Sequence, residues 1–288
     1  TAGHFPQFFD AAHLAAGRTL PVARADGGFR HAFAGARYGI GVDILDVQAC
    51  RERGIVVTNV PDYCLDEVAD HTIANAFMLM RNIPHYNQCV RAGSYRWQDW
   101  FAPIPRFRGA TFGLLGFGRI AQNAARKLQV FGFRVIAYDP FLSESFMATN
   151  GVEKVELRTL FAESDVVSLH APLTPDTHHI VNADTLKLMK PSAYVICTSR
   201  GKCIDNKALY DALVGKQIAG AAVDDPEEEP MKMKHWSPEG NPLFRLDNFF
   251  CTPHTAYVSV QSLQECRRVA SNNVKAVLLG QKPTDQIG

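Results

Sequence analysis

Three kinds of ionisable side chain follow successive hydrophobic runs in the second half of the sequence. Arg200 comes after the run at residues 193–199. An acidic run at residues 226–230 follows the next hydrophobic segment, and His254 follows the last one. An arginine binds carboxylate and carbonyl oxygens with its planar fork. A histidine exchanges a proton with a hydroxyl or a nascent alkoxide, and a glutamate on its other ring nitrogen orients it. Together these groups suit the interconversion of a 2-oxo acid and a 2-hydroxy acid.

Each of these side chains also has an ordinary structural interpretation. Arg200 could be a loop arginine with a surface partner, and the acidic run could be a solvated loop. His254 follows Pro253 and could be a turn residue. Spacing alone leaves both interpretations open, because it does not say whether these residues meet.

The elements that carry these residues alternate between short β-rich runs and amphipathic helical segments from residue 111 to residue 254. The hydrophobic runs are TFGLLG, FRVIAYD, DVVSLH, AYVICTS and IAGAAVD. Strands of this kind, separated by helices, indicate a parallel sheet covered on both faces. The sequence therefore predicts a doubly wound α/β domain. Ligands in such folds bind at the carboxyl ends of the strands, so the three ionisable groups could converge there.

The stretch GLLGFGRIA has the spacing of a dinucleotide-binding turn. Gly116 allows the tight turn, Gly118 lets a pyrophosphate approach the backbone, and Ala121 lets helix and strand pack closely. The helix that begins near Arg119 and Ile120 presents N–H groups and the positive end of its dipole to phosphate. A strand before the glycines and a helix after them favour a Rossmann-type nucleotide site over a structural turn.

Asp139 ends the next hydrophobic run, FRVIAYD, about 20 residues beyond the glycines, where a ribose 2′-OH is held in dinucleotide folds. A carboxylate there repels a 2′-phosphate, and the following Pro140, Phe141 and Leu142 supply no basic residue. The predicted cofactor is therefore NAD rather than NADP. The alternative is that Asp139 only caps the strand before Pro140.

Composition limits the classes of partner. The chain has 288 residues, of which 47% are hydrophobic, and its net charge is +1. No block of like charge predicts nucleic-acid binding, and no hydrophobic run approaches the roughly 20 residues of a membrane span. The seven cysteines have no zinc-site spacing, so no metal is expected and free thiols in a reducing cytoplasm are predicted. No signal peptide is visible.

Both ends of the chain are predicted to build a second, smaller α/β domain. Residues 259–279 have the pattern of a last helix that returns after the main α/β block. The predicted division assigns residues 1–82 and 258–288 to this substrate domain and residues 83–257 to the NAD-binding domain.

Many ordered motifs together resemble the D-isomer-specific 2-hydroxyacid dehydrogenases, near the branch that contains the C-terminal binding proteins. The matching segments are RYGIGVD, VTNVPDYCLDEVAD, GLLGFGRIA, AYDP, SDVVSLHAPLT, TSRG, AAVDDPEEEP and TPH. The resemblance implies an NAD-dependent oxidoreductase with a Rossmann-type lobe and a smaller flavodoxin-like lobe. It also implies a substrate cleft between the lobes and a homodimer formed through the NAD lobe.

The resemblance assigns catalytic roles by position. Arg200 of TSRG resembles the family's substrate-binding arginine, and His254 of TPH resembles the proton donor. The family's catalytic acid stands directly before a proline and five residues past an aspartate, here Asp224, which selects Glu229.

The resemblance also assigns binding positions. Backbone amides at Ile40 and Gly41 are expected to hold the substrate carboxylate, and residues 171–177 resemble the adenosine side. The substrate positions are Arg37, Ile40, Gly41, Tyr63 and Tyr257. The cofactor positions are Gly116, Gly118, Arg119, Ile120, Asp139, Ala171, Pro172, Thr177, Thr198, Ser199 and Asp224.

Some positions depart from the family pattern. The common Val-Phe after the strand-end aspartate is Asp225-Pro226 here, which adds a charge and could shift the loop. Tyr257 predicts an aromatic wall in the pocket. Residues 1–36 are too short and irregular for the usual opening units, so either part of the first lobe is absent from this sequence or the lobe is abbreviated. The first alternative is favoured, because a strand missing from a sheet exposes an edge.

Two functions follow from these patterns. The first is an NAD-dependent enzyme that interconverts a small 2-oxo acid and a D-2-hydroxy acid. The second is an NAD(H)-sensing, corepressor-like binding module with little turnover, as in the same branch of the family.

Overall fold

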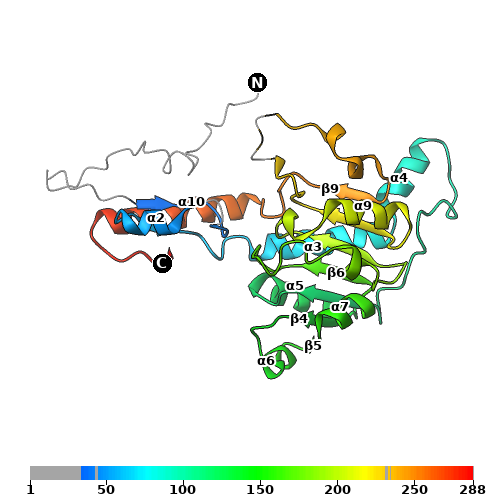
Figure 1. Cartoon of the computed structure of the whole chain (residues 1–288), viewed down its shortest axis with the longest axis horizontal. Coiled ribbons are helices and arrows are strands. Elements are labelled where there is room, and N and C mark those ends of the chain that lie inside the picture. Colours follow the sequence, from blue (N-terminus) through cyan, green and yellow to red (C-terminus); the bar gives the residue numbers. More distant parts are fainter. Residues whose placement is uncertain (1–33, 43–44, 231–232, 234, 288) are drawn as a thin grey trace. The chain divides into compact units, whose positions relative to one another are not determined.

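A computed structural model describes residues 34–42, 45–230, 233 and 235–287, and the chain divides into two compact units (Figure 1). One comprises Thr1–Cys64 with Val258–Gly288, and the other comprises Leu65–Tyr257. The division falls before helix α3 (Leu65–Met80), whereas the sequence pattern placed it near residue 82. The structural reason is that the buried side of α3 packs against helix α5 (Arg119–Val130) and the sheet of the larger unit.

Within the described residues, the larger unit is built on a seven-stranded parallel sheet, and the predicted doubly wound Rossmann-type fold is confirmed. The spatial order of the strands is β5-β4-β3-β6-β7-β8-β9. Their bounds are β3 Thr111–Leu115, β4 Arg134–Tyr138, β5 Glu153–Lys154, β6 Val166–Leu169, β7 Tyr194–Cys197, β8 Gly220–Val223 and β9 Phe249–Cys251. From β3 the chain adds β4 and β5 on one side, and it then crosses back to add β6 and the later strands on the other side. In such sheets the expected place for a ligand is the crevice beyond the carboxyl ends of the two strands at this switch, β3 and β6.

Helices cover both faces of this sheet because successive strand residues point to opposite sides. Phe112 and Leu114 of β3 join a buried cluster with α3 and α5, whereas Leu115 joins the opposite cluster with α7, α8 and α9. Strands β3, β6, β7 and β8 are buried along their whole length, as expected for a sheet between two helical layers. The remaining helical bounds are α4 Ile83–Arg91, α6 Glu144–Thr149, α7 Leu157–Glu163, α8 Ala183–Leu186, η1 Gly201–Cys203, α9 Asn206–Val214, η3 Pro238–Gly240 and η4 Pro242–Arg245.

The smaller unit joins both ends of the described chain, as the sequence predicted. Its sheet has the order β1 (Ala34–Ala36), β2 (Val56–Thr58) and β10 (Gln286–Ile287), with β10 antiparallel to β2. Its helices are α2 (Val47–Glu52) and α10 (Val260–Leu278), and α10 begins with a capping box between Ser259 and Ser262. Residues 1–33 lie outside the described residues, so the expectation of an incomplete first lobe is not tested.

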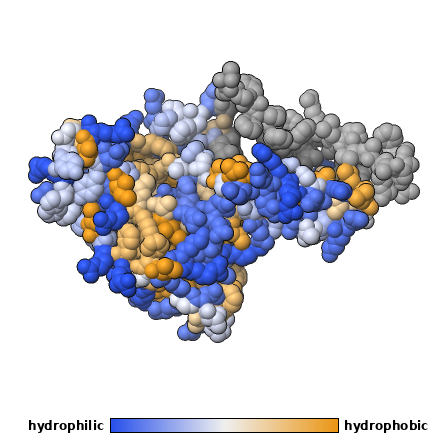
Figure 2. Space-filling view, turned by 180° about the vertical axis from the view of Figure 1, so that it is seen from behind, coloured by the Kyte–Doolittle hydropathy of each residue, from blue (hydrophilic) through white to orange (hydrophobic). Residues whose placement is uncertain are grey.

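The surface of the larger unit exposes several large hydrophobic side chains. Figure 2 shows orange, hydrophobic residues among blue, hydrophilic ones on one face of this unit. The most exposed include Ile83 and Val90 on α4, Tyr95, Trp97 and Trp100 in the segment that follows, and Val130, Phe141 and Val214 elsewhere. Of the helices in the described part of the chain, none combines the length and hydrophobicity that a bilayer crossing requires.

Candidate active site

The glycine turn follows strand β3 at the crevice between β3 and β6. Gly116 has φ 87°, a conformation that L side chains rarely adopt. A Cβ placed on Gly116 would lie 2.8 Å from the amide nitrogen of Ala171, which follows β6. The protein fold itself therefore requires a glycine at this position.

Gly118 has a different reason to be a glycine. Its φ of −72° and ψ of −173° suit any residue, and an added Cβ would meet no protein atom within 4 Å. Gly118 is the N-cap of α5, and no side chain caps this helix end. The space beside Gly118 is therefore open, which fits the binding of a pyrophosphate at backbone N–H groups.

Asp139 lies beside the glycine turn, at the end of β4. One carboxylate oxygen accepts a hydrogen bond from the Phe117 amide at 2.9 Å. The other accepts one from the Phe141 amide, also at 2.9 Å, which is a local cap of the strand end. Asp139 is thus both a cap and a negative charge next to the predicted pyrophosphate turn.

The segment expected on the adenosine side is organised by its own hydrogen bonds. Thr177 Oγ1 donates to the Pro172 carbonyl at 2.6 Å and accepts from the Thr174 amide at 2.7 Å. The Thr177 hydroxyl therefore shapes this turn, while Ala171 contacts the glycine turn through its backbone.

Thr198 and Ser199 follow strand β7 and connect it to Arg200. The Thr198 hydroxyl lies 2.9 Å from that of Thr72 on α3. The Ser199 carbonyl accepts a hydrogen bond from Arg200 Nη1 at 2.9 Å. The second contact holds the Arg200 guanidinium against its own backbone at the carboxyl end of β7.

Asp224 follows strand β8 and organises the loop that carries His254. One of its carboxylate oxygens accepts from Thr252 Oγ1 at 2.6 Å and from the Thr255 amide at 2.9 Å. The other accepts from the Ala256 amide at 2.8 Å. Its backbone carbonyl accepts from the His254 amide at 2.7 Å. A buried carboxylate with this many hydrogen bonds is strongly held, so it fixes the backbone on both sides of His254.

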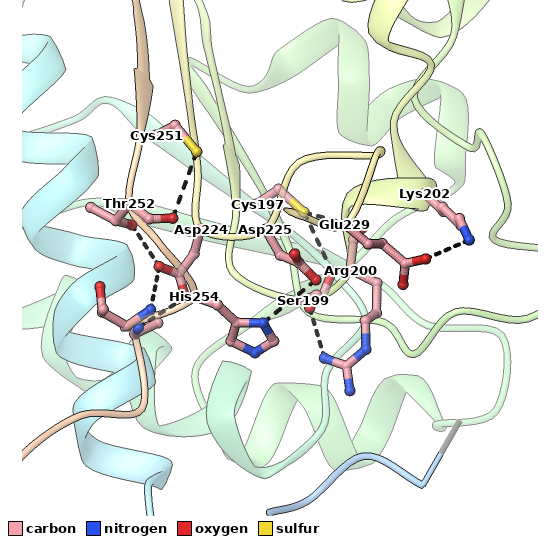
Figure 3. Close-up of polar contacts among 12 residues, drawn as sticks. Cys197, Ser199, Arg200, Lys202, Asp224, Asp225, Glu229, Cys251, Thr252 and His254 are labelled. Carbon is pink, nitrogen blue, oxygen red and sulfur yellow. Dashed lines mark hydrogen bonds and ion pairs between the residues drawn. The ribbon is translucent and has the colours of Figure 1, made fainter. Parts of the chain in front are cut away.

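His254 has φ 53°, so its side chain leaves the loop from a left-handed backbone position. About a third of the side chain, 32%, is exposed. Its Nδ1 lies 3.6 Å from Oδ2 of Asp225 (Figure 3). Its ring meets the Tyr257 ring edge-on, with centroids 6.0 Å apart. The imidazole is therefore placed between a carboxylate and an aromatic ring, with part of its surface open.

Glu229 lies in the same group of residues but faces a different partner. Its Oε2 accepts from Lys202 Nζ at 2.6 Å, which raises the pKa of Lys202. Figure 3 shows the Glu229 carboxylate pointing toward Lys202 and away from the imidazole of His254. The structure thus brings Arg200, Asp225 and His254 together, while the Glu229–His254 pair expected from the sequence is not formed in this conformation.

The rest of the acidic run is not a solvated loop. Glu227 pairs with His179 at 2.6 Å and also accepts from the Asn206 amide at the start of α9. Glu228 accepts from the side-chain amides of Asn206 and Asn241 at 3.0 Å each. These two glutamates anchor the loop between β8 and η3 and have structural partners of their own.

Sequence patterns assign no role to two residues of the site. Asp225 stands out only as an extra charge directly after Asp224 at a strand end, and nothing in the sequence distinguishes Lys202. Gly201 explains how Asp225 is held, because a Cβ on Gly201 would lie 2.3 Å from the Asp225 carbonyl oxygen. The loop after β8 packs directly on the backbone next to Arg200.

The cysteines near the site are buried thiols rather than reactive groups. Burial raises the pKa of Cys197 to about 12 and that of Cys251 to about 12. Both therefore stay protonated at neutral pH, which removes the thiolate needed for nucleophilic attack. In the part of the chain that the structure describes, no cluster of three or more His, Cys, Asp or Glu side chains could hold a metal ion.

The expected substrate positions Arg37, Ile40, Gly41 and Tyr63 belong to the smaller unit. Arg37 Nε donates to the Gly41 carbonyl at 3.2 Å, and the Ile40 carbonyl accepts from Asn59 at 2.9 Å. Tyr63 packs on the hydrophobic cluster that includes Cys266. These contacts shape the loop at residues 37–41, and the substrate roles of the four residues stay predictions.

Comparisons with known proteins relate the sequence and fold of this chain to dehydrogenases. Residues 73–256 match the family described as D-isomer specific 2-hydroxyacid dehydrogenase, NAD binding domain. D-3-phosphoglycerate dehydrogenase of Methanocaldococcus jannaschii is 37% identical over 85% of this chain, which spans only 45% of that relative. Glyoxylate reductase of Thermofilum pendens is 35% identical, with 85% of this chain and 72% of the relative covered.

Solved structures agree. D-lactate dehydrogenase of Aquifex aeolicus, complexed with NAD and lactic acid, has a TM-score of 0.77 and 30% sequence identity to this chain. The similarity covers 88% of this chain and 78% of that protein.

Replacing Gly118 by serine should separate cofactor binding from folding. Serine is a good N-cap residue and its Cβ meets open space, so the free energy of unfolding should change by less than about 0.5 kcal/mol. The same side chain would occupy the space of a pyrophosphate, so the Kd for NADH should rise about tenfold or more. Urea unfolding and NADH fluorescence titration measure the two quantities.

Gly116→Ala is the matched control for that experiment. It places a Cβ against the Ala171 backbone at a positive φ, so it should lower the free energy of unfolding by about 1–3 kcal/mol. Unchanged NADH affinity in Gly118→Ser would exclude the glycine turn from the cofactor site.

Replacing Asp139 by alanine should relax the preference for NADH over NADPH. The change removes an acceptor for the ribose 2′-OH and a charge that repels a 2′-phosphate. The ratio of the Kd for NADPH to the Kd for NADH should therefore fall about tenfold. Asp184→Asn, which removes an exposed carboxylate on α8, is the control. A ratio that does not change in Asp139→Ala would leave this residue with its capping role alone.

Proposed function

Because the chain belongs to the D-isomer-specific 2-hydroxyacid dehydrogenase family and contains its NAD-binding domain, we propose that it interconverts a 2-oxo acid and a D-2-hydroxy acid. The observation that carries the proposal is the group at the carboxyl ends of β7, β8 and β9. It combines a guanidinium, two carboxylates and a partly open imidazole, and the cofactor turn after β3 lies at the same edge of the sheet.

The chemistry divides between the protein and the cofactor. When bound, NAD accepts or supplies the hydride at the substrate carbon. Arg200 binds the carboxylate and the 2-oxygen of the substrate and stabilises developing negative charge there. His254 donates a proton to that oxygen during reduction and takes one from the hydroxyl during oxidation. Its Nε2 is the transferring atom, because Nδ1 faces Asp225.

Glu229 is proposed as the acid that orients His254 during turnover. Its support is the family motif and its closeness to the site. Burial is the largest cause of the raised pKa of Asp225, and the nearby charge of Glu229 raises this pKa further. In the present conformation its carboxylate is bound by Lys202. Orientation of the imidazole by Glu229 would require exchange of this partner.

The remaining assignments follow from the same proposal. Asp139, Thr198 and Ser199 hold the cofactor together with the glycine turn, and Tyr257 forms an aromatic wall beside His254. All seven cysteines, which lie in the described part of the chain, are free thiols, and this usage supports a reducing compartment such as the cytoplasm.

The function is tested by NADH oxidation with a panel of 2-oxo acids. His254→Gln should lower kcat by about 10²-fold or more, because a proton-transfer group is lost. NADH affinity should stay unchanged, and His235→Gln, at an exposed histidine, should keep full activity. Native protein that binds NADH tightly but turns over none of the acids would favour the NAD(H)-sensing binding module instead.

A homodimer formed through the NAD-binding unit is part of the proposal. Its support is an exposed hydrophobic surface formed by α4 and the segment after it, which a hydrogen bond from Tyr86 Oη to the Trp97 carbonyl holds together. On this surface Val90 is 52% exposed and Trp97 is 67% exposed. A face of this kind on a folded unit indicates an interaction site.

The dimer predicts a solution mass of about twice the 31.8 kDa of the chain, measured by light scattering. Val90→Glu should shift the mass toward the monomer, because a charge would be buried in the interface. Val214→Glu makes the same change at an exposed valine on α9 and should leave the dimer intact. A monomeric native protein would contradict the proposal.

A further inference from the structure

Asp225 is a buried carboxylate with an unusual set of neighbours. The residue is 8% exposed and follows the strand-end Asp224. Among the described residues, the His254 imidazole is its only ion-pair or hydrogen-bond partner, with Nδ1 and Oδ2 separated by 3.6 Å. Adjacent Asp224, by contrast, accepts hydrogen bonds from one hydroxyl and two backbone amides.

The hydrogen bonds of Asp224 give its carboxylate a structural role, whereas in the described part of the chain the Asp225 carboxylate accepts no hydrogen bond that would stabilise the fold. A buried carboxylate without hydrogen bonds is unfavourable, because it loses water without full replacement. Burial raises the pKa of Asp225, and the charges of Glu229 and Asp224 add to this effect, while His254 and Arg200 oppose it. The favourable interactions of the Asp225 charge therefore come from the two groups expected to meet the substrate.

The backbone fixes the distance between Asp225 and His254. The Asp224 amide is bonded to the Cys197 carbonyl at 2.8 Å, and the Asp224 carbonyl accepts from the His254 amide at 2.7 Å. The Asp225 carbonyl in turn packs against Gly201. Asp225 and His254 are thus attached to the same rigid point at the end of β8.

We propose that Asp225 is a positioning residue that holds the His254 ring through Nδ1 and so presents Nε2 to the substrate. It takes this role in the conformation in which Lys202 holds the Glu229 carboxylate (Figure 3). A carboxylate that faces Nδ1 favours the neutral tautomer that carries its proton there. The catalytic meaning of this inference rests on the proposed function, but the geometry is testable without turnover.

The direct test is the ¹⁵N spectrum of the His254 ring in the whole protein without cofactor, assigned by its absence in His254→Gln. In native protein the neutral ring should be mainly the Nδ1–H tautomer. Asp225→Ala, which removes the acceptor, should shift the ring toward the Nε2–H tautomer. Unchanged tautomer populations in Asp225→Ala would overturn the proposal.

A second measurement uses Asp225→Asn in the reduction of 2-oxo acids. Loss of the carboxylate that faces Nδ1 leaves the ring less well oriented for proton transfer, so kcat should fall about tenfold while KM for the 2-oxo acid stays within about twofold. The charged groups that face Asp225 are His254, Arg200, Glu229 and Asp224, so Glu229→Gln is measured beside it. A kcat that falls in Glu229→Gln but not in Asp225→Asn would assign the role to Glu229 alone and overturn the proposal.

Stability separates this role from a structural one. Because the folded pKa of Asp225 is raised, its ionisation disfavours the folded state as the pH rises through that value. Neutral Asn removes this effect, so Asp225→Asn should keep or increase the Tm at pH 7.

The control for the ring spectrum is Glu228→Gln, a change on the same loop away from His254, which should leave the tautomer of the His254 ring unchanged. If no 2-oxo acid is turned over, the proposed function fails while the ring spectrum still decides the role of Asp225.

Discussion

The buried carboxylate of Asp224 is the interaction on which the candidate site depends. It accepts hydrogen bonds from Thr252, Thr255 and Ala256, and its carbonyl holds the amide of His254. A tight loop at a strand end exposes backbone N–H groups that need acceptors. A charged acceptor satisfies several of them at once and draws the loop after β9 onto the end of β8. The left-handed backbone of His254 is held by these bonds on both sides.

Two adjacent aspartates do different work in this arrangement. The Asp224 carboxylate accepts hydrogen bonds from backbone amides and so shapes the loop. The Asp225 carboxylate instead interacts electrostatically with His254 and Arg200. A protein that needed only a stable fold would gain from an uncharged residue at the second position. Retaining a buried charge beside an imidazole and a guanidinium is the arrangement by which binding sites set protonation states. Lys202 also affects this arrangement, because its ion pair with Glu229 gives that carboxylate a partner other than His254.

The cofactor side shows the same separation between folding and function. Gly116 is required by the chain itself, because the backbone at Ala171 leaves no room for a Cβ. Gly118 is required by nothing in the protein, and the space in front of it is open. A family motif alone treats the two glycines alike, whereas the structure shows which one serves the fold and which one leaves open space. Asp139 serves the fold through the hydrogen bonds that it accepts from the Phe117 and Phe141 amides.

The sequence by itself determined the doubly wound sheet, the cofactor turn and the strand ends that carry Arg200 and His254. It could do so because hydrophobic periodicity and glycine spacing are local properties of the chain, and parallel strands bring their carboxyl ends to one edge. Only the tertiary structure decided which carboxylate faces the imidazole. The direction of Glu229 depends on Lys202, and the position of Asp225 depends on close packing against Gly201. Both contacts join residues far apart in the chain, so no local pattern contains them.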